Sequence, residues 1–276
     1  MRGSEAIVQM LRQLGVEVIF GLCGDTSLPL YESLHDLGRD IRHVLSRDER
    51  SAAYMADAYA RLSGKVGVCE GPSGGGATYI VPGVAEANGS SVPLVCLTSD
   101  IDVRDVGRGT LTELDQRALF QPVTKWSSVP SHASQVPGAL RQAFREAASG
   151  SLGAAHLALP YNVQLEEVDP ADVYADPAWN RYPAYREAPL PEDVRRAAKR
   201  LVEARRPLLV AGAGVLRSGA WEELKALAHL LGAPVATSIS GKGSIAETDP
   251  YALGVIGSNG GLSYRHEILR ESDVIF

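Results

Sequence analysis

Apolar and amphipathic segments alternate along the first part of the chain. Short apolar runs predict strands at 16–20, 41–45, 65–69, 92–98 and 154–159. Between them, apolar residues recur with a helical period and predict helices at 4–14, 27–37, 49–63, 76–88 and 133–148. Strands that alternate with helices in this way form a parallel sheet with helices on both faces. The pattern therefore predicts an α/β fold with a doubly wound parallel sheet.

The composition changes after residue 160. Proline recurs at positions 170, 177, 183, 189 and 191, with Tyr and Asp between, which predicts an extended linker that wraps a surface. A second alternation follows, with helices at 191–204, 218–231 and 262–270 and strands at 207–211 and 234–237. We therefore predict two domains, 1–165 and 191–276, joined by a linker over 166–190.

Residues 274–276, VIF, are typical of the start of a buried strand, and no turn or polar tail follows them. A sheet cut at that point would leave an unpaired apolar edge. We therefore expect an incomplete Rossmann-like α/β second domain, and a chain that is a fragment, a split subunit or part of a longer protein.

Composition and charge exclude several classes of protein. The chain has 276 residues, 45% of them hydrophobic, and a formal net charge of −6. Basic residues form only pairs on predicted helix ends, which argues against nucleic-acid binding. No apolar stretch approaches the roughly 20 residues that cross a bilayer, and the N-terminus is already an amphipathic helix, not a signal sequence. We expect a cytoplasmic protein without a membrane segment.

The cysteines and histidines show no metal-ligand spacing. The 3 cysteines are widely separated and form no CxxC pair, so neither a disulfide framework nor a zinc site is predicted. Cys69 and Cys96 fall in predicted strands and are expected in the core. His156 is expected to be a strand residue. No metal ligands are predicted within the chain.

Residues 47–64, RDERSAAYMADAYARLSG, place Glu49 where a strand ends and a helix begins. A carboxylate in the first turn is favoured by the helix dipole, Asp48 can cap the helix, and Gly64 can end it. By itself this pattern is also typical of an ordinary amphipathic helix.

Three further segments change that interpretation. Residues 18–31, VIFGLCGDTSLPLY, end a strand in a glycine turn. Residues 71–79, GPSGGGATY, place glycines between a strand and a helix, where the backbone can approach a ligand closely. Residues 111–127, LTELDQRALFQPVTKWS, follow in the same order. Together with residues 47–64, these segments resemble enzymes that depend on thiamine diphosphate, in particular those of the acetolactate synthase type.

The resemblance implies a role for each segment. Glu49 would share a proton with N1′ of the cofactor's aminopyrimidine, so that the 4′-amino group can deprotonate C2 of the thiazolium ring. The first domain would be the pyrimidine-binding domain and the second would be part of the central domain. The residues expected to bind the cofactor are Cys23, Gly24, Asp25, Glu49, Pro72, Gly74 and Gly76.

The chain departs from the family pattern at several positions. Asp48 stands where histidine is common, and Tyr79 replaces an asparagine. Thr112 occupies the position of a glutamine that faces the substrate, whereas Lys125 of the PVTK segment is retained. Thr112 and Lys125 are the expected substrate residues, and the change at Thr112 leaves the substrate undetermined.

The second domain carries a weaker signal. Residues 207–219, PLLVAGAGVLRSG, form a strand followed by a GxG turn, with Arg217 where a dinucleotide fold has its third glycine. In the acetolactate synthase branch this domain binds FAD, in other branches it binds a different nucleotide, and in many it binds none. The alternative for this chain is a turn that only packs a helix on a strand. The residues expected at such a nucleotide site are Gly212, Gly214, Thr237, Gly257 and Gly260.

The resemblance implies an enzyme that decarboxylates a 2-oxo acid, joins it to an acceptor, or both. Thiamine diphosphate would lie at a subunit interface of a homo-oligomer, and the Mg²⁺ ligands would lie outside this chain segment, because no GDG motif occurs here. Two alternatives stay open: a simple 2-oxo acid decarboxylase or carbon–carbon lyase, and a noncatalytic regulatory or binding subunit that keeps the fold. The chain alone is expected to be inactive.

Overall fold

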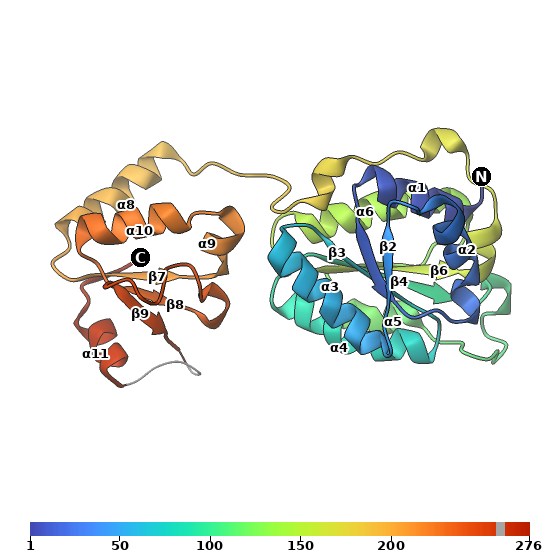
Figure 1. Ribbon diagram of the computed structural model, residues 1–276, viewed down its shortest axis with the longest axis horizontal. Helices are drawn as coiled ribbons and strands as arrows, with labels where there is room; N and C mark the ends of the chain where they lie inside the picture. Colours follow the sequence, from blue (N-terminus) through green and yellow to red (C-terminus); the bar gives the residue numbers. More distant parts are fainter. Residues whose placement is uncertain (258–262) are drawn as a thin grey trace. The chain divides into compact units, whose positions relative to one another are not determined.

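The computed structural model describes residues 1–257 and 263–276, and the chain divides into two compact units, Met1–Tyr185 and Arg186–Phe276 (Figure 1). The first unit is built on a six-stranded sheet in the order β2-β1-β3-β4-β6-β5, in which every pairing is parallel. Its strands are β1 (Val18–Gly21), β2 (Arg42–Leu45), β3 (Gly67–Gly71), β4 (Leu94–Asp100), β5 (Trp126–Ser128) and β6 (Ala154–Pro160). The predicted doubly wound α/β fold is confirmed.

Helices cover both faces of this sheet. The helices of the first unit are α1 (Gly3–Gln13), α2 (Leu28–Leu37), α3 (Glu49–Ser63), α4 (Gly75–Gly89), α5 (Gln116–Phe120), α6 (Val136–Ala148) and α7 (Tyr161–Leu165). Helices α1, α2 and α6 contribute to the hydrophobic cluster on one face, and α3 and α4 to the cluster on the other. Strand β5 and the short helices α5 and α7 were not predicted, because three to five residues are too short to show a periodicity.

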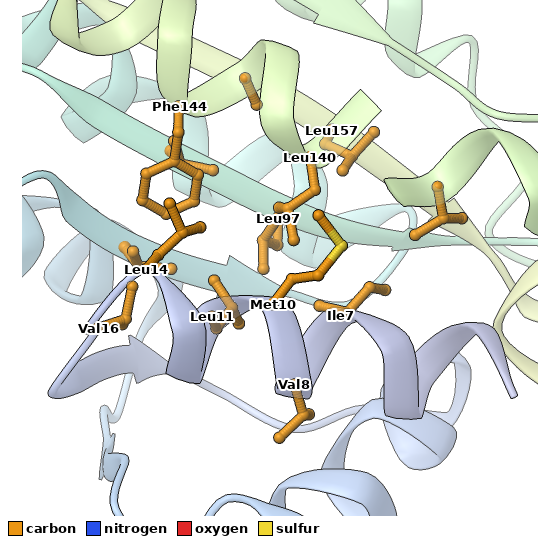
Figure 2. Close-up of a cluster of buried hydrophobic side chains, with 14 of the residues drawn as sticks. Ile7, Val8, Met10, Leu11, Leu14, Val16, Leu97, Leu140, Phe144 and Leu157 are labelled. Atoms are coloured by element: carbon orange, nitrogen blue, oxygen red, sulfur yellow. The ribbon is translucent and has the colours of Figure 1, made fainter. Parts of the chain in front are cut away.

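The larger cluster packs α1 against the sheet and α6 (Figure 2). Ile7, Met10 and Leu11 of α1 are fully buried, and Leu140 and Phe144 of α6 are buried with them. Full burial of one such side chain contributes about 1.5–3 kcal/mol. Cys69 and Cys96 lie in the cluster on the other face, which confirms their predicted place in the core.

Two glycines let α3 pack closely against the sheet and against α4. A Cβ added at Gly67 would lie 2.3 Å from the carbonyl oxygen of Ala56, and one added at Gly83 would lie 2.5 Å from Cβ of Ala53. Neither position has room for a side chain. The close packing fixes α3, and with it the first residue of that helix, Glu49.

The segment predicted as a linker packs against the first unit along most of its length. Val168, Val173 and Asn180 are buried. The Val168 amide donates to the carbonyl of Met1 (2.8 Å), and Asn180 Nδ2 donates to the carbonyl of Gly15 (3.0 Å). The boundary between the compact units therefore falls at residue 185, within the segment 166–190.

The second unit contains a parallel sheet in the order β10-β7-β8-β9. Its strands are β7 (Pro207–Ala211), β8 (Val235–Thr237), β9 (Ala252–Val255) and β10 (Val274–Ile275), and its helices are α8 (Pro191–Glu203), α9 (Ala213–Ser218), α10 (Trp221–Leu231) and α11 (Ser263–Glu271). The predicted helix at 218–231 corresponds to α10 but begins later, at Trp221, and α9 was not predicted. Gly219 has a left-handed φ of +71° and separates the two helices. Residues 274–276 start a strand as predicted, but Ile275 and Phe276 are more than half exposed. None of the helices in the described parts of the chain is long and apolar enough to span a membrane.

Candidate active site

The carboxyl ends of β1, β2 and β3 meet at one edge of the first sheet, since the strands are parallel. The loops that follow them carry most of the predicted cofactor residues: 22–27 after β1, 46–49 after β2 and 72–76 after β3. Ligands of open parallel sheets bind at this edge. The topology therefore brings together three segments that are spread over residues 22–76 of the sequence.

Glu49 is the first residue of α3 and is 8% exposed. Asp48 caps the helix by accepting a hydrogen bond from the Arg50 amide (2.9 Å), which fixes where the helix begins. A Cβ added at Gly76 would lie 3.2 Å from Glu49 Oε1, and one added at Gly71 would lie 3.5 Å from Glu49 Cγ. Within residues 1–257 and 263–276, the Glu49 carboxylate has no hydrogen bond or ion pair. Its oxygens are therefore available to a ligand that approaches past the glycines.

Pro72 is the centre of the loop contacts around Glu49. A Cβ added at Gly24 or at Gly76 would lie 2.5 Å from the Pro72 side chain. Gly74 has a φ of +61°, and a Cβ there would lie 2.7 Å from Cβ of Thr112. Gly24, Pro72, Gly74, Gly76 and Thr112 thus form one contiguous group beside Glu49.

The remaining predicted residues of the first unit are placed differently. Cys23 and Asp25 lie in the same loop as Gly24 and are exposed. Lys125 lies outside the group: its amide bonds Ala154, the first residue of β6, at the amino-terminal edge of the sheet. Its ammonium donates to the carbonyl oxygens of Glu146 and Ser149 at the end of α6. The structure thus gives Lys125 a helix-capping role and does not bring it to the group beside Glu49.

A buried acid near this site was not predicted. Glu70 of β3 is 1% exposed, accepts a hydrogen bond from the Tyr31 hydroxyl, and lies 3.4 Å from His43 Nε2. Burial raises the pKa of Glu70, and the charge of Glu49 raises it further. The signal in the sequence was a glutamate in an otherwise apolar strand, GVCEG.

A second buried network holds the chain that leads from Thr112 back to the sheet. His156 of β6 is bonded on both ring nitrogens, to Thr98 (2.7 Å) and Ser127 (2.8 Å). Its ring stacks on Phe120 of α5 with centroids 3.6 Å apart. Burial lowers the pKa of His156 to about 3, so the ring is neutral. Gln116 bonds Thr98 and the carbonyl of Ser99, which ties α5 to β4.

The carboxyl edge of the second sheet holds the predicted nucleotide residues. A Cβ added at Gly212 or Gly214, directly after β7, would meet no atom within 4 Å. Thr237, at the end of β8, is 3% exposed, and its hydroxyl has no hydrogen-bond partner among the described residues. Gly257 has a φ of +106°, and Gly260 lies outside the described residues. The edge thus combines open space with an unsatisfied buried hydroxyl.

No group of three His, Cys, Asp or Glu side chains in the described parts of the chain could hold a metal ion. The site combines the buried Glu49 carboxylate with a glycine-rich loop at a sheet edge, and the buried Glu70 lies near it. That arrangement suits an organic cofactor with a ring that can exchange a proton with a carboxylate.

Comparison with known families agrees with this description. The N-terminal TPP-binding domain of thiamine pyrophosphate enzymes matches residues 1–119, and the central domain of the same enzymes matches residues 194–276. These two domains together cover more than half of the chain, which belongs to the thiamine pyrophosphate enzyme family.

Individual relatives carry more specific names. A probable acetolactate synthase large subunit of Methanococcus aeolicus is 41% identical over 100% of this chain and 46% of its own length. One of Methanocaldococcus jannaschii is 39% identical over the same shares. The acetolactate synthase large subunit of Corynebacterium glutamicum is 36% identical over 95% of this chain and 42% of its own length. The chain thus spans about half the length of the curated relatives it matches.

Proposed function

We propose that this chain is the cofactor-activating part of a thiamine diphosphate-dependent enzyme of the acetolactate synthase type, acting on a small 2-oxo acid. The observation that carries the proposal is Glu49, a buried carboxylate without a partner among the described residues, at a glycine-lined sheet edge. The names of the relatives support the reaction class.

The residues fit the pyrimidine end of the cofactor. Gly71 and Gly76 place no side chain against the buried Glu49 carboxylate, and the Pro72 side chain packs against Gly24 and Gly76. We propose that Gly24, Pro72, Gly74 and Gly76 line the ring and that Cys23 and Asp25 lie at the rim. When bound, thiamine diphosphate supplies a nucleophilic carbon and an electron sink.

Glu49 would hold the proton that the pyrimidine nitrogen takes up and releases. A carboxylate largely removed from water is suited to this exchange, because water does not compete for the hydrogen bond. Thr112, in contact with Gly74, would face the reacting substrate. Lys125 has no part in the proposed site, since its ammonium caps α6.

The diphosphate and its Mg²⁺ need oxygen ligands that the described residues do not gather. We propose that they come from a further domain of a partner subunit, so that the cofactor lies at the interface of a homo-oligomer. Exposed apolar side chains on α3 and α4, including Tyr54, Met55 and Tyr79, are available for such contacts. Sedimentation of the full-length protein as a monomer in the presence of cofactor would contradict this arrangement.

Glu49→Gln tests the assignment. An amide can still hydrogen-bond to the ring but cannot take up its proton, so we expect hydrogen exchange at cofactor C2 to slow by at least about 100-fold in the full-length protein. Asp48→Asn is the matched control: it removes a neighbouring negative charge, and asparagine caps a helix as well as aspartate. Undiminished exchange in Glu49→Gln, or equal losses in both variants, would refute the role of Glu49.

We also propose that the second unit binds FAD at the carboxyl edge of β7 and β8. The open space at Gly212 and Gly214 and the unsatisfied Thr237 hydroxyl support this proposal over a turn that only packs a helix on a strand. The full-length protein should then purify with flavin absorbance. Gly214→Val should remove the flavin without unfolding the protein, because a Cβ at this position meets no atom of a neighbouring element within 4 Å and would extend into the space proposed for the ligand. A protein that stays colourless after reconstitution with FAD would exclude flavin.

A further inference from the structure

Thr112 is held in an unusual backbone conformation at the site. Its φ of +68° is in the left-handed region, which a β-branched residue adopts only against a steric cost. Such residues persist where neighbouring structure enforces them, and they cluster at functional sites. The contacts that hold Thr112 in this conformation therefore indicate its role at the site.

Two contacts from the glycine loop hold Thr112. Its hydroxyl is 2.7 Å from the hydroxyl of Ser73. Gly74, itself left-handed with a φ of +61°, lies so close that an added Cβ would be 2.9 Å from Thr112 Cα. On the other side of Thr112, the Glu113 carboxylate accepts a hydrogen bond from the Gly109 amide (2.7 Å) and so shapes the loop that carries Thr112.

Ser73 continues the chain of hydroxyls to a third segment. The Thr26 hydroxyl donates to Ser73 Oγ (3.0 Å) and accepts from the Ser73 amide (3.1 Å). Ser73 is 5% exposed, so water does not readily replace these bonds. Either hydroxyl can donate in the bond between Ser73 and Thr112, because the Ser73 oxygen can accept a second hydrogen bond or donate its own proton. Three hydroxyls from loops 39 and 47 residues apart thus form one ordered hydrogen-bonded row, which we call the hydroxyl clasp.

The hydroxyl clasp lies next to the contacts that border Glu49. Pro72 precedes Ser73, and its ring occupies the place where a Cβ on Gly24 or Gly76 would be. The same Cβ on Gly76 would lie 3.2 Å from Glu49 Oε1. Pro72 is rigid, so a displacement of Ser73 would be passed to Gly76 and would change the space beside the carboxylate.

We infer that Thr26, Ser73 and Thr112 are positioning residues for cofactor activation: the hydroxyl clasp holds the loop 72–76 at the spacing from Glu49 that the pyrimidine ring requires. The inference rests on the proposed function for its consequence, but the clasp itself is a property of this chain. The competing explanation is that these bonds only stabilise the fold.

The test uses Ser73→Ala and Thr112→Val, each of which removes one hydroxyl, while valine keeps the β-branched shape of threonine. Thr124→Val is the matched control, because the Thr124 hydroxyl lies in the same segment as Thr112 but bonds the carbonyl of Phe120 (2.7 Å) and touches no part of the loop. Thr112→Ser restores the hydroxyl and should recover the wild-type amide exchange of the loop 72–76.

Two measurements are made on each variant. Without cofactor, amide hydrogen exchange of the peptide that contains Ser73 should quicken about 10-fold or more in Ser73→Ala and Thr112→Val, with other peptides unchanged. With thiamine diphosphate and Mg²⁺, exchange at cofactor C2 in the full-length protein should slow roughly 10- to 100-fold, the usual effect of a small misplacement near reacting groups. Thr124→Val should change neither rate.

Each other outcome overturns part of the reasoning. Quickened amide exchange in all peptides, with C2 exchange unchanged per folded molecule, would show that the bonds only stabilise the fold. Unchanged exchange in the loop would show that no clasp exists. If the wild type itself fails to activate C2, the proposed function is wrong, and the amide measurement then decides the clasp alone.

Discussion

Gly76→Ala tests how tightly Pro72 packs beside Glu49, and a matched variant accounts for the change in the stability of α4 itself. The added methyl group would lie 2.5 Å from Cγ and Cδ of Pro72, whereas apolar carbons pack at about 3.5–4.0 Å. About 1 Å must therefore be gained by movement of the ring. Pro72 cannot rotate away, because Gly24 already lies against its other side. Overpacking of this kind costs about 1–3 kcal/mol of unfolding free energy.

Gly75→Ala is the matched control in the preceding position of the same helix. A Cβ on Gly75 meets no atom within 4 Å, and alanine favours a helix over glycine by up to about 1 kcal/mol. The two variants carry the same chemical change, yet we expect their unfolding free energies to move in opposite directions. The difference between them should be about 1–4 kcal/mol, the sum of the two effects.

Urea unfolding measures this difference if the signal comes from one unit. Trp126 and Trp179 belong to the first unit and Trp221 to the second, so the variants are made in a Trp221→Phe background and followed by tryptophan fluorescence. The midpoints are compared at constant m-value. In the full-length protein, Gly76→Ala should also slow exchange at cofactor C2, and Gly75→Ala should not. Equal midpoints, or equal C2 exchange rates, would refute the packing around Pro72 described here.

Two predictions concern pH. Burial lowers the pKa of His156 to about 3, so below about pH 6.5 the unfolded chain binds a proton at this residue and the folded chain does not. The free energy of unfolding should therefore fall by about 1.4 kcal/mol per pH unit as the pH decreases from 6.5 towards 3. His156→Asn should reduce the measured slope of unfolding free energy against pH by that amount. Asp100 is the reverse case, because burial raises its pKa to about 6, and the free energy of unfolding should fall as the pH rises from about 3.8 to 6. In Asp100→Asn the side-chain oxygen can still accept the hydrogen bond that the Ile101 amide donates (2.8 Å). This variant should be up to about 3 kcal/mol more stable than the wild type at pH 7 and equally stable at pH 3.

Local sequence determined the secondary structure and the place of Glu49. Apolar runs and helical periods predicted five strands of the first sheet, because each is a property of consecutive residues. The sequence also placed Glu49 at a strand–helix junction, where the Asp48 cap fixes the start of α3. The alternation of strands and helices then required a parallel sheet, and a parallel sheet collects the loops after its strands at one edge.

Only the tertiary structure decided which side chains meet there. Lys125 was grouped with Thr112 because the two are close in sequence, but α5 carries the chain across the sheet and leaves Lys125 at the opposite edge. Glu70 was overlooked because its burial depends on Tyr31 and His43, which come from other elements. The hydroxyl clasp joins Thr26, Ser73 and Thr112 across three loops. Such contacts depend on strand order and register, which the periodicity of a single segment does not contain.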